Sequence, residues 1–136
     1  MTSISQAECL PAWALGPFSP PKRVLEDRAE VTFACPLSGA SVAWAAKDAF
    51  NPGAVVHDGR ICLLVRGEDR IGRYAGTSRF GLATGSDRYT FDLDPELVLS
   101  PGHDRWQAWE WPGGIEDPRV VASSGLRLVR SVTLTA

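Results

Sequence analysis

Histidine and cysteine are scarce in this chain of 136 residues, and each scarcity excludes a class of site. The only histidines are His57 and His103, which excludes a histidine-rich metal centre. The three cysteines, at positions 9, 35 and 62, form no Cys-x-x-Cys pair, so a zinc knuckle and a thioredoxin-type motif are excluded. An odd number of widely spaced cysteines is typical of reduced thiols, and we expect a cytoplasmic protein.

Long apolar runs and an excess of positive charge are also missing. No run approaches the roughly 18 residues that span a membrane, and the first twenty residues lack the basic and then apolar order of a secretory signal. The net charge is −2 with a pI near 5.6, which argues against the basic surface of a typical nucleic-acid-binding domain. We therefore expect neither a membrane nor a nucleic acid as partner.

Glycine and proline are plentiful, with 13 and 10 residues, which favours a turn-rich fold over a helical bundle. From residue 42 onward, short apolar runs alternate with turns. Asp58-Gly59 separates two β-branched runs and is the strongest hairpin signal, and turns at 85–87 and 123–125 predict two more hairpins. The pattern predicts an all-β antiparallel fold, in which sandwich, barrel and propeller all fit.

The first forty residues differ in pattern from the rest, because five prolines interrupt them. We expect residues 1–40 to form an irregular N-terminal arm, with a short helix over 22–30, and residues 41–136 to form the β domain. Two longer connections are predicted at 67–77 and 94–114. The second is rich in tryptophan and is either a sugar-stacking platform or a lid packed on the sheet.

Polar residues gather where strands meet loops, and two pairs of adjacent carboxylates are among them. Adjacent residues of an extended segment point to opposite sides, and Pro118 favours an extended Asp117. One of Glu116 and Asp117 is then expected to face a site while the other braces the backbone or pairs with an arginine. A glycosidase needs two carboxylates on one sugar. A combination of Asp117 with Glu68 or Asp69 would supply them, and surface carboxylates at strand ends are the alternative.

Twelve of the 14 basic residues are arginines, whose forked donors suit carboxylates, phosphates and paired sugar hydroxyls. A nucleotide bias in the gene explains such an excess, but not why Arg66, Arg79 and Arg119 all stand at predicted strand ends. Asn51, before Pro52, is either an ordinary turn residue or an amide that binds a ligand hydroxyl.

These clusters, in their order along the chain, resemble the mannoside phosphorylases of glycoside hydrolase family 130. The resemblance covers most of the chain but departs from the family pattern at 22–32 and after Arg119, where a tyrosine-rich strand is missing. The main matching blocks are Trp-Ala-Leu-Gly-Pro-Phe at 13–18, Phe-Asn-Pro-Gly-Ala-Val-Val at 50–56, Leu-Val-Arg-Gly-Glu-Asp at 64–69, Thr-Ser-Arg-Phe-Gly-Leu-Ala at 77–83 and Glu-Trp-Pro-Gly-Gly-Ile-Glu-Asp-Pro-Arg at 110–119.

The resemblance implies a five-bladed β-propeller, of which this chain holds two to three blades. It also implies inverting phosphorolysis of β-1,4-mannosides such as mannosyl-glucose. Inorganic phosphate is then the co-substrate, no cofactor is needed, and the products are α-mannose 1-phosphate and a free sugar. The phosphate-binding residues of the family lie in blades beyond this chain, so we expect the chain to be inactive alone. Open blade edges are expected to favour homo-oligomers.

The resemblance also assigns residues. Asp117 matches the catalytic acid, which passes its proton to the glycosidic oxygen through a mannose hydroxyl. Asn51 and Arg66 match positions that hold the mannosyl unit, and Asp69 and Arg79 match positions near the pocket. Trp109 is the further candidate for sugar binding. The alternatives are a hydrolase of the same family and a non-catalytic mannoside-binding or interaction module.

Overall fold

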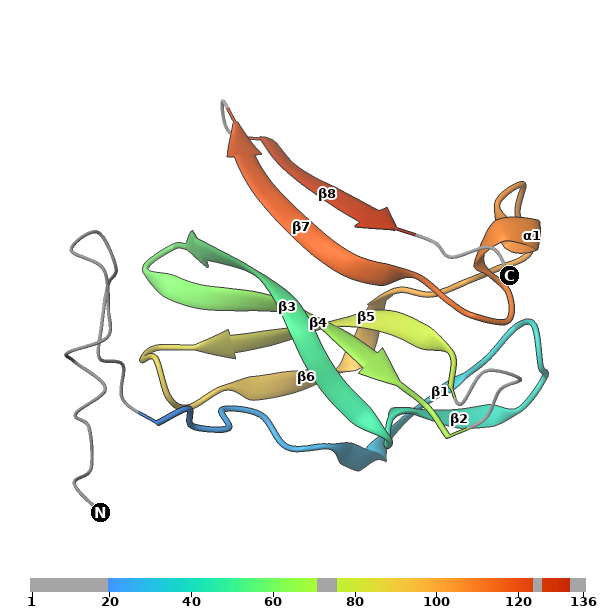
Figure 1. Cartoon of the computed structure of the whole chain (residues 1–136), viewed down its shortest axis with the longest axis horizontal. Coiled ribbons are helices and arrows are strands. Elements are labelled where there is room, and N and C mark those ends of the chain that lie inside the picture. The colour runs from blue at the N-terminus through green and yellow to red at the C-terminus, as the bar shows by residue number, and fades with distance from the viewer. Residues whose placement is uncertain (1–19, 71–75, 124–125, 133–136) are drawn as a thin grey trace, which may run out of the picture.

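The computed structural model describes residues 20–70, 76–123 and 126–132, and the chain there is built almost entirely of strands (Figure 1). The prediction of an all-β antiparallel fold is confirmed. Three antiparallel sheets form, with strand orders β1-β2, β3-β4-β5-β6 and β7-β8. The elements are β1 (Arg28–Ala34), β2 (Ser41–Ala45), β3 (Asp48–His57), β4 (Arg60–Glu68), β5 (Ser78–Gly85), β6 (Asp92–Leu99), α1 (Gln107–Glu110), β7 (Glu116–Ser123) and β8 (Leu126–Val132).

All three predicted hairpins are present. Asp58 and Gly59 form the two-residue loop between β3 and β4, with φ values of 49° and 74°. Positive φ at both loop residues is the mark of the turn that matches the twist of paired strands. The other two hairpins join β5 to β6 and β7 to β8, which pair antiparallel.

The expected helix over 22–30 is wrong. Residues 28–34 form strand β1, which pairs antiparallel with β2, so the part of the 1–40 segment that the structure describes is not wholly irregular. The helix prediction rested on Pro21 as a starting residue. Pairing of the alternating Arg-Ala-Glu-Val-Thr-Phe-Ala segment with β2 outweighs that weak local preference.

The connection predicted at 94–114 begins later than expected, because β6 continues to Leu99. The rest of it includes α1, a helix of four residues that the sequence pattern did not indicate. Within the described ranges, no helix combines the length and the apolar character needed to cross a membrane.

Alternation along β4 gives the central sheet two different faces. Leu63 and Val65 point to one face, where they form an apolar cluster with Ala83 and Phe91. Leu64 points to the other face and packs with Phe80 and Ile115, and Val120 of β7 borders this second cluster. Arg66 is two residues beyond Leu64 and so lies on the face that β7 covers.

Trp44 of β2 anchors the smaller β1-β2 sheet to the central one. Its indole is fully buried and packs on two glycines, Gly67 of β4 and Gly81 of β5. A β-carbon at Gly81 would lie 2.1 Å from the indole, so only glycine admits the ring here. The indole nitrogen also donates a 3.4 Å hydrogen bond to the carbonyl of Pro95.

Candidate active site

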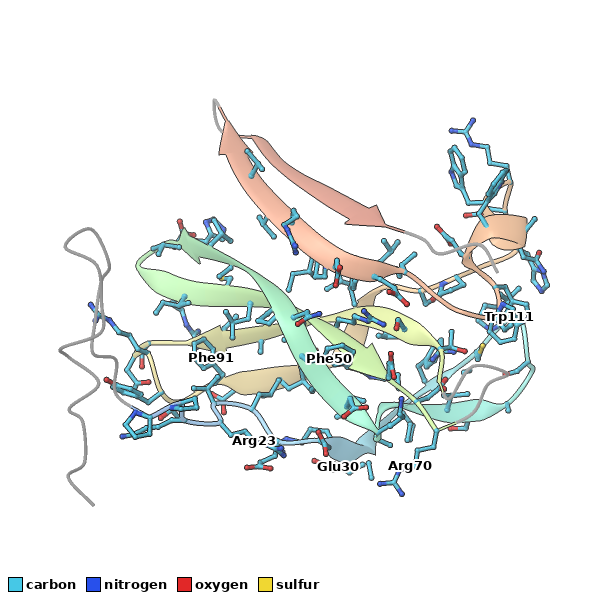
Figure 2. The ribbon with its side chains drawn as sticks, viewed as in Figure 1. Arg23, Glu30, Phe50, Arg70, Phe91 and Trp111 are labelled. Atoms are coloured by element: carbon cyan, nitrogen blue, oxygen red, sulfur yellow. The ribbon has the colours of Figure 1, made fainter. Side chains whose placement is uncertain are left out.

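Arg66, at the end of β4, is the centre of a polar cluster on the sheet face beneath β7. Its Nε donates a 2.9 Å hydrogen bond to Oγ of Ser78. Its Nη2 lies 2.9 Å from Oε1 of Glu68 and 2.9 Å from Oε1 of Glu116. The guanidinium carbon stands 4.6 Å from the centre of the Phe50 ring, which Figure 2 labels over the middle of the sheet. Arg66 is thus fixed by contacts from β3, β4, β5 and β7.

Asn51 and Asp117 meet above this arginine. Asn51 Nδ2 donates a 3.2 Å hydrogen bond to Asp117 Oδ1, and Arg66 Nη1 lies 3.6 Å from the same oxygen. Both residues stand where the strand register shifts, between Phe50 and Gly53 in β3 and between Glu116 and Arg119 in β7. Both have left-handed backbones, with φ of 43° and 49°. Such bulges redirect side chains beside functional sites.

The expectation that Glu116 and Asp117 point to opposite sides is wrong. Both carboxylates reach the guanidinium of Arg66. The prediction assumed an extended segment, but Asp117 has φ 49° because the β7 bulge begins there. The influence of Pro118 on its neighbour is a preference that the bulge overrides.

A close backbone contact holds the two bulges side by side. A β-carbon on Gly53 would lie 2.9 Å from the carbonyl oxygen of Pro118 and 3.1 Å from Cγ2 of Val120. Glycine therefore allows β3 and β7 to approach within van der Waals distance just beyond the Asn51–Asp117 pair. The position of the pair is fixed by main chain as well as by side chains.

Lys47 supplies the second cation of the cluster, with Nζ 2.5 Å from Oε2 of Glu68. Burial raises the pKa of Glu68, but the Lys47 hydrogen bond, the Lys47 charge and Arg66 lower it by more, so the pKa lies below its ordinary value. The hydrogen bond to Glu68 raises the pKa of Lys47. Lys47 also pairs with Asp48 at 3.5 Å. Of the three carboxylates around Arg66, the Asp117 side chain, 41% exposed, is the most open.

Asp69 and Arg79 form a fully buried ion pair beside the cluster. Asp69 Oδ1 accepts a 2.9 Å hydrogen bond from the backbone N–H of Thr77, and Arg79 Nη1 donates 3.1 Å to the Thr77 carbonyl. Arg79 also lies over the Phe33 ring, 4.9 Å from its centre. With about 1% of each residue exposed, this pair braces the start of β5 and presents no surface to a sugar here.

Trp109 lies outside the cluster. It is on α1 with 56% of its surface exposed, and Figure 1 shows α1 at the edge of the molecule, beyond the start of β7. Trp111, which follows α1, is likewise well separated from Phe50 in Figure 2. Sugar binding by Trp109 stays a prediction. Arg119 is exposed too, and its Nη1 donates to the carbonyl of Pro118.

Sequence reasoning missed Lys47 and Ser78 as members of the cluster. Ser78 pairs with Glu68 across the β4-β5 ladder, which places it beside Arg66. That register depends on the connection between the two strands, residues 69–77, and the sequence pattern of this connection does not define it. Strand alternation does place Ser78 on the same face of β5 as Phe80, which is the face of Arg66. It does not say which residue of β4 lies opposite Ser78.

An apolar groove of ≈ 210 Å³ borders the opposite sheet face, and Phe50, whose ring also contacts Arg66, is part of its lining. No group of three or more His, Cys, Asp or Glu side chains suited to hold a metal ion occurs among the described residues. Cys35 and Cys62 are free thiols. The groove is lined by Arg23, Val24, Leu25, Ala49, Phe50, Pro52, Leu63 and Val65.

The fold of the chain is similar to that of solved glycoside-processing enzymes, whereas no family model and no curated protein matches the sequence. A glycosyl hydrolase from Bacteroides ovatus is 39% identical, with a TM-score of 0.79 over 90% of this chain. A structure from Bacteroides thetaiotaomicron is 36% identical, with the same TM-score.

A third structure comes from work on the GH130 family of mannoside phosphorylases, which contains hydrolases of β-1,2 mannosidic linkages in Candida mannan. It is 40% identical over 90% of this chain, with a TM-score of 0.79. This chain spans only 36% of the length of that protein and 36% of the Bacteroides ovatus one. The chain is therefore similar, over nine tenths of its length, to part of a protein of glycoside hydrolase family 130.

Proposed function

We propose that this chain is part of an inverting phosphorylase of family 130, which cleaves β-1,4-mannosides such as mannosyl-glucose with inorganic phosphate and releases α-mannose 1-phosphate. The observation that carries the proposal is the exposure of the Asp117 carboxylate and the placement of its contacts. This carboxylate is the most exposed of three carboxylates around Arg66, and both of its contacts fall on Oδ1. Because Oδ1 is engaged by Asn51 and Arg66, we assign the proton-donating role to Oδ2.

In this mechanism Asp117 is the catalytic acid. It passes the Oδ2 proton to the glycosidic oxygen through a mannose hydroxyl. Asn51 uses its amide nitrogen on Asp117, which leaves its amide oxygen to accept from a sugar hydroxyl. Arg66 Nη1, at 3.6 Å from Asp117, is too far for a full hydrogen bond and is the donor left for the sugar. Phosphate brings its own nucleophilic oxygen, so one acid is sufficient.

The charge of the cluster supports a separate site for phosphate. With Asp117 protonated as the acid, Glu68, Glu116 and Asp48, which lies 3.5 Å from Lys47, still outnumber Lys47 and Arg66, and an excess negative charge repels a phosphate dianion. The cations that hold phosphate would then come from sequence outside this chain, which spans 36% of its structural relatives. Four-stranded antiparallel sheets are the units of propeller blades, so we interpret the β3-β6 sheet as one blade, with β1-β2 and β7-β8 as parts of others. Alone, the chain would be inactive.

Hydrolysis of β-mannosides is the second candidate, because one similar structure comes from work on family 130 hydrolases. An inverting hydrolase needs a second carboxylate that activates water. Glu68 and Glu116 both pair with Arg66 and are only 13% and 19% exposed, so neither is open to a water on the far side of a sugar. A hydrolase would have to supply that base from outside this chain.

The test uses the protein in its full coding length, incubated with mannosyl-glucose with and without inorganic phosphate. Phosphorus NMR and sugar chromatography identify the products. We expect α-mannose 1-phosphate in the presence of phosphate and no cleavage without it. Mannose released at equal rates in both reactions would show a hydrolase. Binding without cleavage would instead support a non-catalytic module and would overturn both enzymatic readings.

A further inference from the structure

Ser78, the first residue of β5, contacts the cluster with its side chain. It is 1% exposed. Its Oγ accepts the 2.9 Å hydrogen bond from Arg66 Nε and donates its one proton to Glu68 Oε1 at 3.3 Å. Because Arg66 has a single Nε–H, this bond sets the plane and direction of the whole guanidinium.

The backbone of Ser78 holds a different segment, the one that leads into β7. Its N–H donates to the Gly113 carbonyl at 3.0 Å, and its carbonyl accepts from the Ile115 N–H at 3.0 Å. The two segments run parallel at this bridge. Gly114, with φ 98°, has no room for a side chain, since a β-carbon would lie 2.2 Å from the Ser78 carbonyl oxygen. Asp117 follows three residues later.

Ser78 itself is held firmly by its neighbour Thr77. The Thr77 hydroxyl donates a 2.8 Å hydrogen bond to the Pro112 carbonyl, and the Thr77 N–H donates to Asp69. The buried pair of Asp69 and Arg79 fixes this part of the chain. Ser78 therefore cannot shift without breaking buried polar contacts, each of which is costly to leave unmade.

We propose that Ser78 is the positioning residue that sets Arg66 relative to Asp117, through its hydroxyl on the arginine and its backbone on the segment that carries the acid. The inference rests on the proposed function, because it names the residue that aligns the acid with its sugar-binding neighbour. Ser78 does not touch the substrate. It joins two elements, β4 and the start of β7, that supply the two reacting-site side chains.

Loss of the hydroxyl leaves the buried Arg66 Nε without its acceptor. The guanidinium must then rotate toward another oxygen, and the 3.6 Å separation between Arg66 Nη1 and Asp117 Oδ1 changes. Misplacement of groups by about 1 Å costs up to about a hundredfold in rate. We expect kcat to fall about tenfold to a hundredfold in Ser78→Ala, with KM changed by less than about threefold.

The experiment measures kcat and KM of the full-length protein in four variants. Ser78→Ala removes the hydroxyl, Ser78→Cys replaces it with a poor hydrogen-bonding group of similar size, and Ser78→Thr keeps it. Ser86→Ala removes an exposed hydroxyl from the bend after β5 and is the matched control. We expect the Ala and Cys variants to lose kcat, and the Thr and control variants to retain it within about threefold. Ser78→Cys keeps the test decisive if Ser78→Ala does not fold.

Rates are normalised to folded protein by circular dichroism. A lower melting temperature with an unchanged kcat of the folded fraction would show a purely structural role and overturn the inference. A crystal structure of Ser78→Ala, or of Ser78→Cys, gives a readout without activity. An Arg66–Asp117 separation that stays at 3.6 Å in the variant would overturn the inference about Ser78. A wild-type protein that turns over no mannoside would contradict the proposed function alone, and the crystal structure would still test the role of Ser78.

Discussion

Asn51 and Asp117 are 66 residues apart in sequence, yet the amide of one donates a 3.2 Å hydrogen bond to the carboxylate of the other. Each stands in a left-handed backbone at a β-bulge. Asn and Asp are the residues other than glycine that adopt this conformation most readily. The same two side chains thus satisfy the local backbone and join two sheets.

Asp117→Asn should abolish most turnover and leave the fold intact. Asparagine tolerates φ 49° as aspartate does, but its amide cannot act as an acid. We expect a loss of about 10²- to 10⁴-fold in kcat/KM of the full-length protein. Asp58→Asn is the matched control, since Asp58 also has φ 49° and lies exposed in the β3-β4 turn. Equal activity losses in both variants would contradict the role of Asp117.

Asn51→Ala and Asn51→Gly separate backbone strain from side-chain chemistry. Both substitutions remove the amide, but only the alanine variant has a strained backbone at φ 43°. We expect Asn51→Ala to be less stable than Asn51→Gly by about 1–2 kcal/mol in urea unfolding. Mannoside turnover should fall in both to a similar extent. If glycine restored activity, the amide would have no role in binding or in holding Asp117.

Glu68→Gln should make stability less sensitive to acid. The pKa of Glu68 is lowered from 4.5, so its stabilising effect is complete above that value and is lost as the pH falls through the lower, folded-state pKa. At pH 7 the variant should be about 1–3 kcal/mol less stable than wild type, because the charged hydrogen bonds are weakened. Below pH 4.5 the difference should shrink. Urea unfolding at a series of pH values measures both. A constant difference would mean that Glu68 does not titrate with folding.

Gly114→Ala should destabilise the protein far more than an ordinary surface substitution. The new β-carbon would meet the Ser78 backbone at 2.2–2.3 Å, at a φ of 98°. We expect a loss of more than about 2 kcal/mol in thermal or urea unfolding. Gly102→Ala, where no atom lies within 4 Å, is the control and should change stability by less than about 0.5 kcal/mol.

The hairpins were predictable because their signals are local. Asp58-Gly59 encodes its turn in two residues, and the alternating runs on either side define the strands. The helix over 22–30 failed for the opposite reason. Its segment is decided by pairing with residues 41–45, which no local preference reveals.

Three members of the candidate site were predictable, but its geometry and its other members were not. The resemblance to family 130 assigns Asn51, Arg66 and Asp117, and the structure brings these three side chains together. Their arrangement depends on two bulges in different sheets, and a register shift leaves no mark in a sequence read strand by strand. That is why Asp117 was expected to be extended, and why Ser78 and Lys47 were missed.

The approach of β7 to β3 at Gly53 has a consequence for the order in which the chain assembles. Synthesis delivers Lys47, Arg66 and Glu68 before β7 exists. With Asp48, which pairs with Lys47 at 3.5 Å, two cations and two carboxylates are then present, and Arg66 still lacks the two partners that Glu116 and Asp117 supply. The carboxylates of the arriving β7-β8 hairpin are attracted to Arg66, which sets one docking position for the hairpin. Asp117, the residue proposed to donate the proton, therefore also contributes to the docking of the β7-β8 sheet on the central sheet during folding.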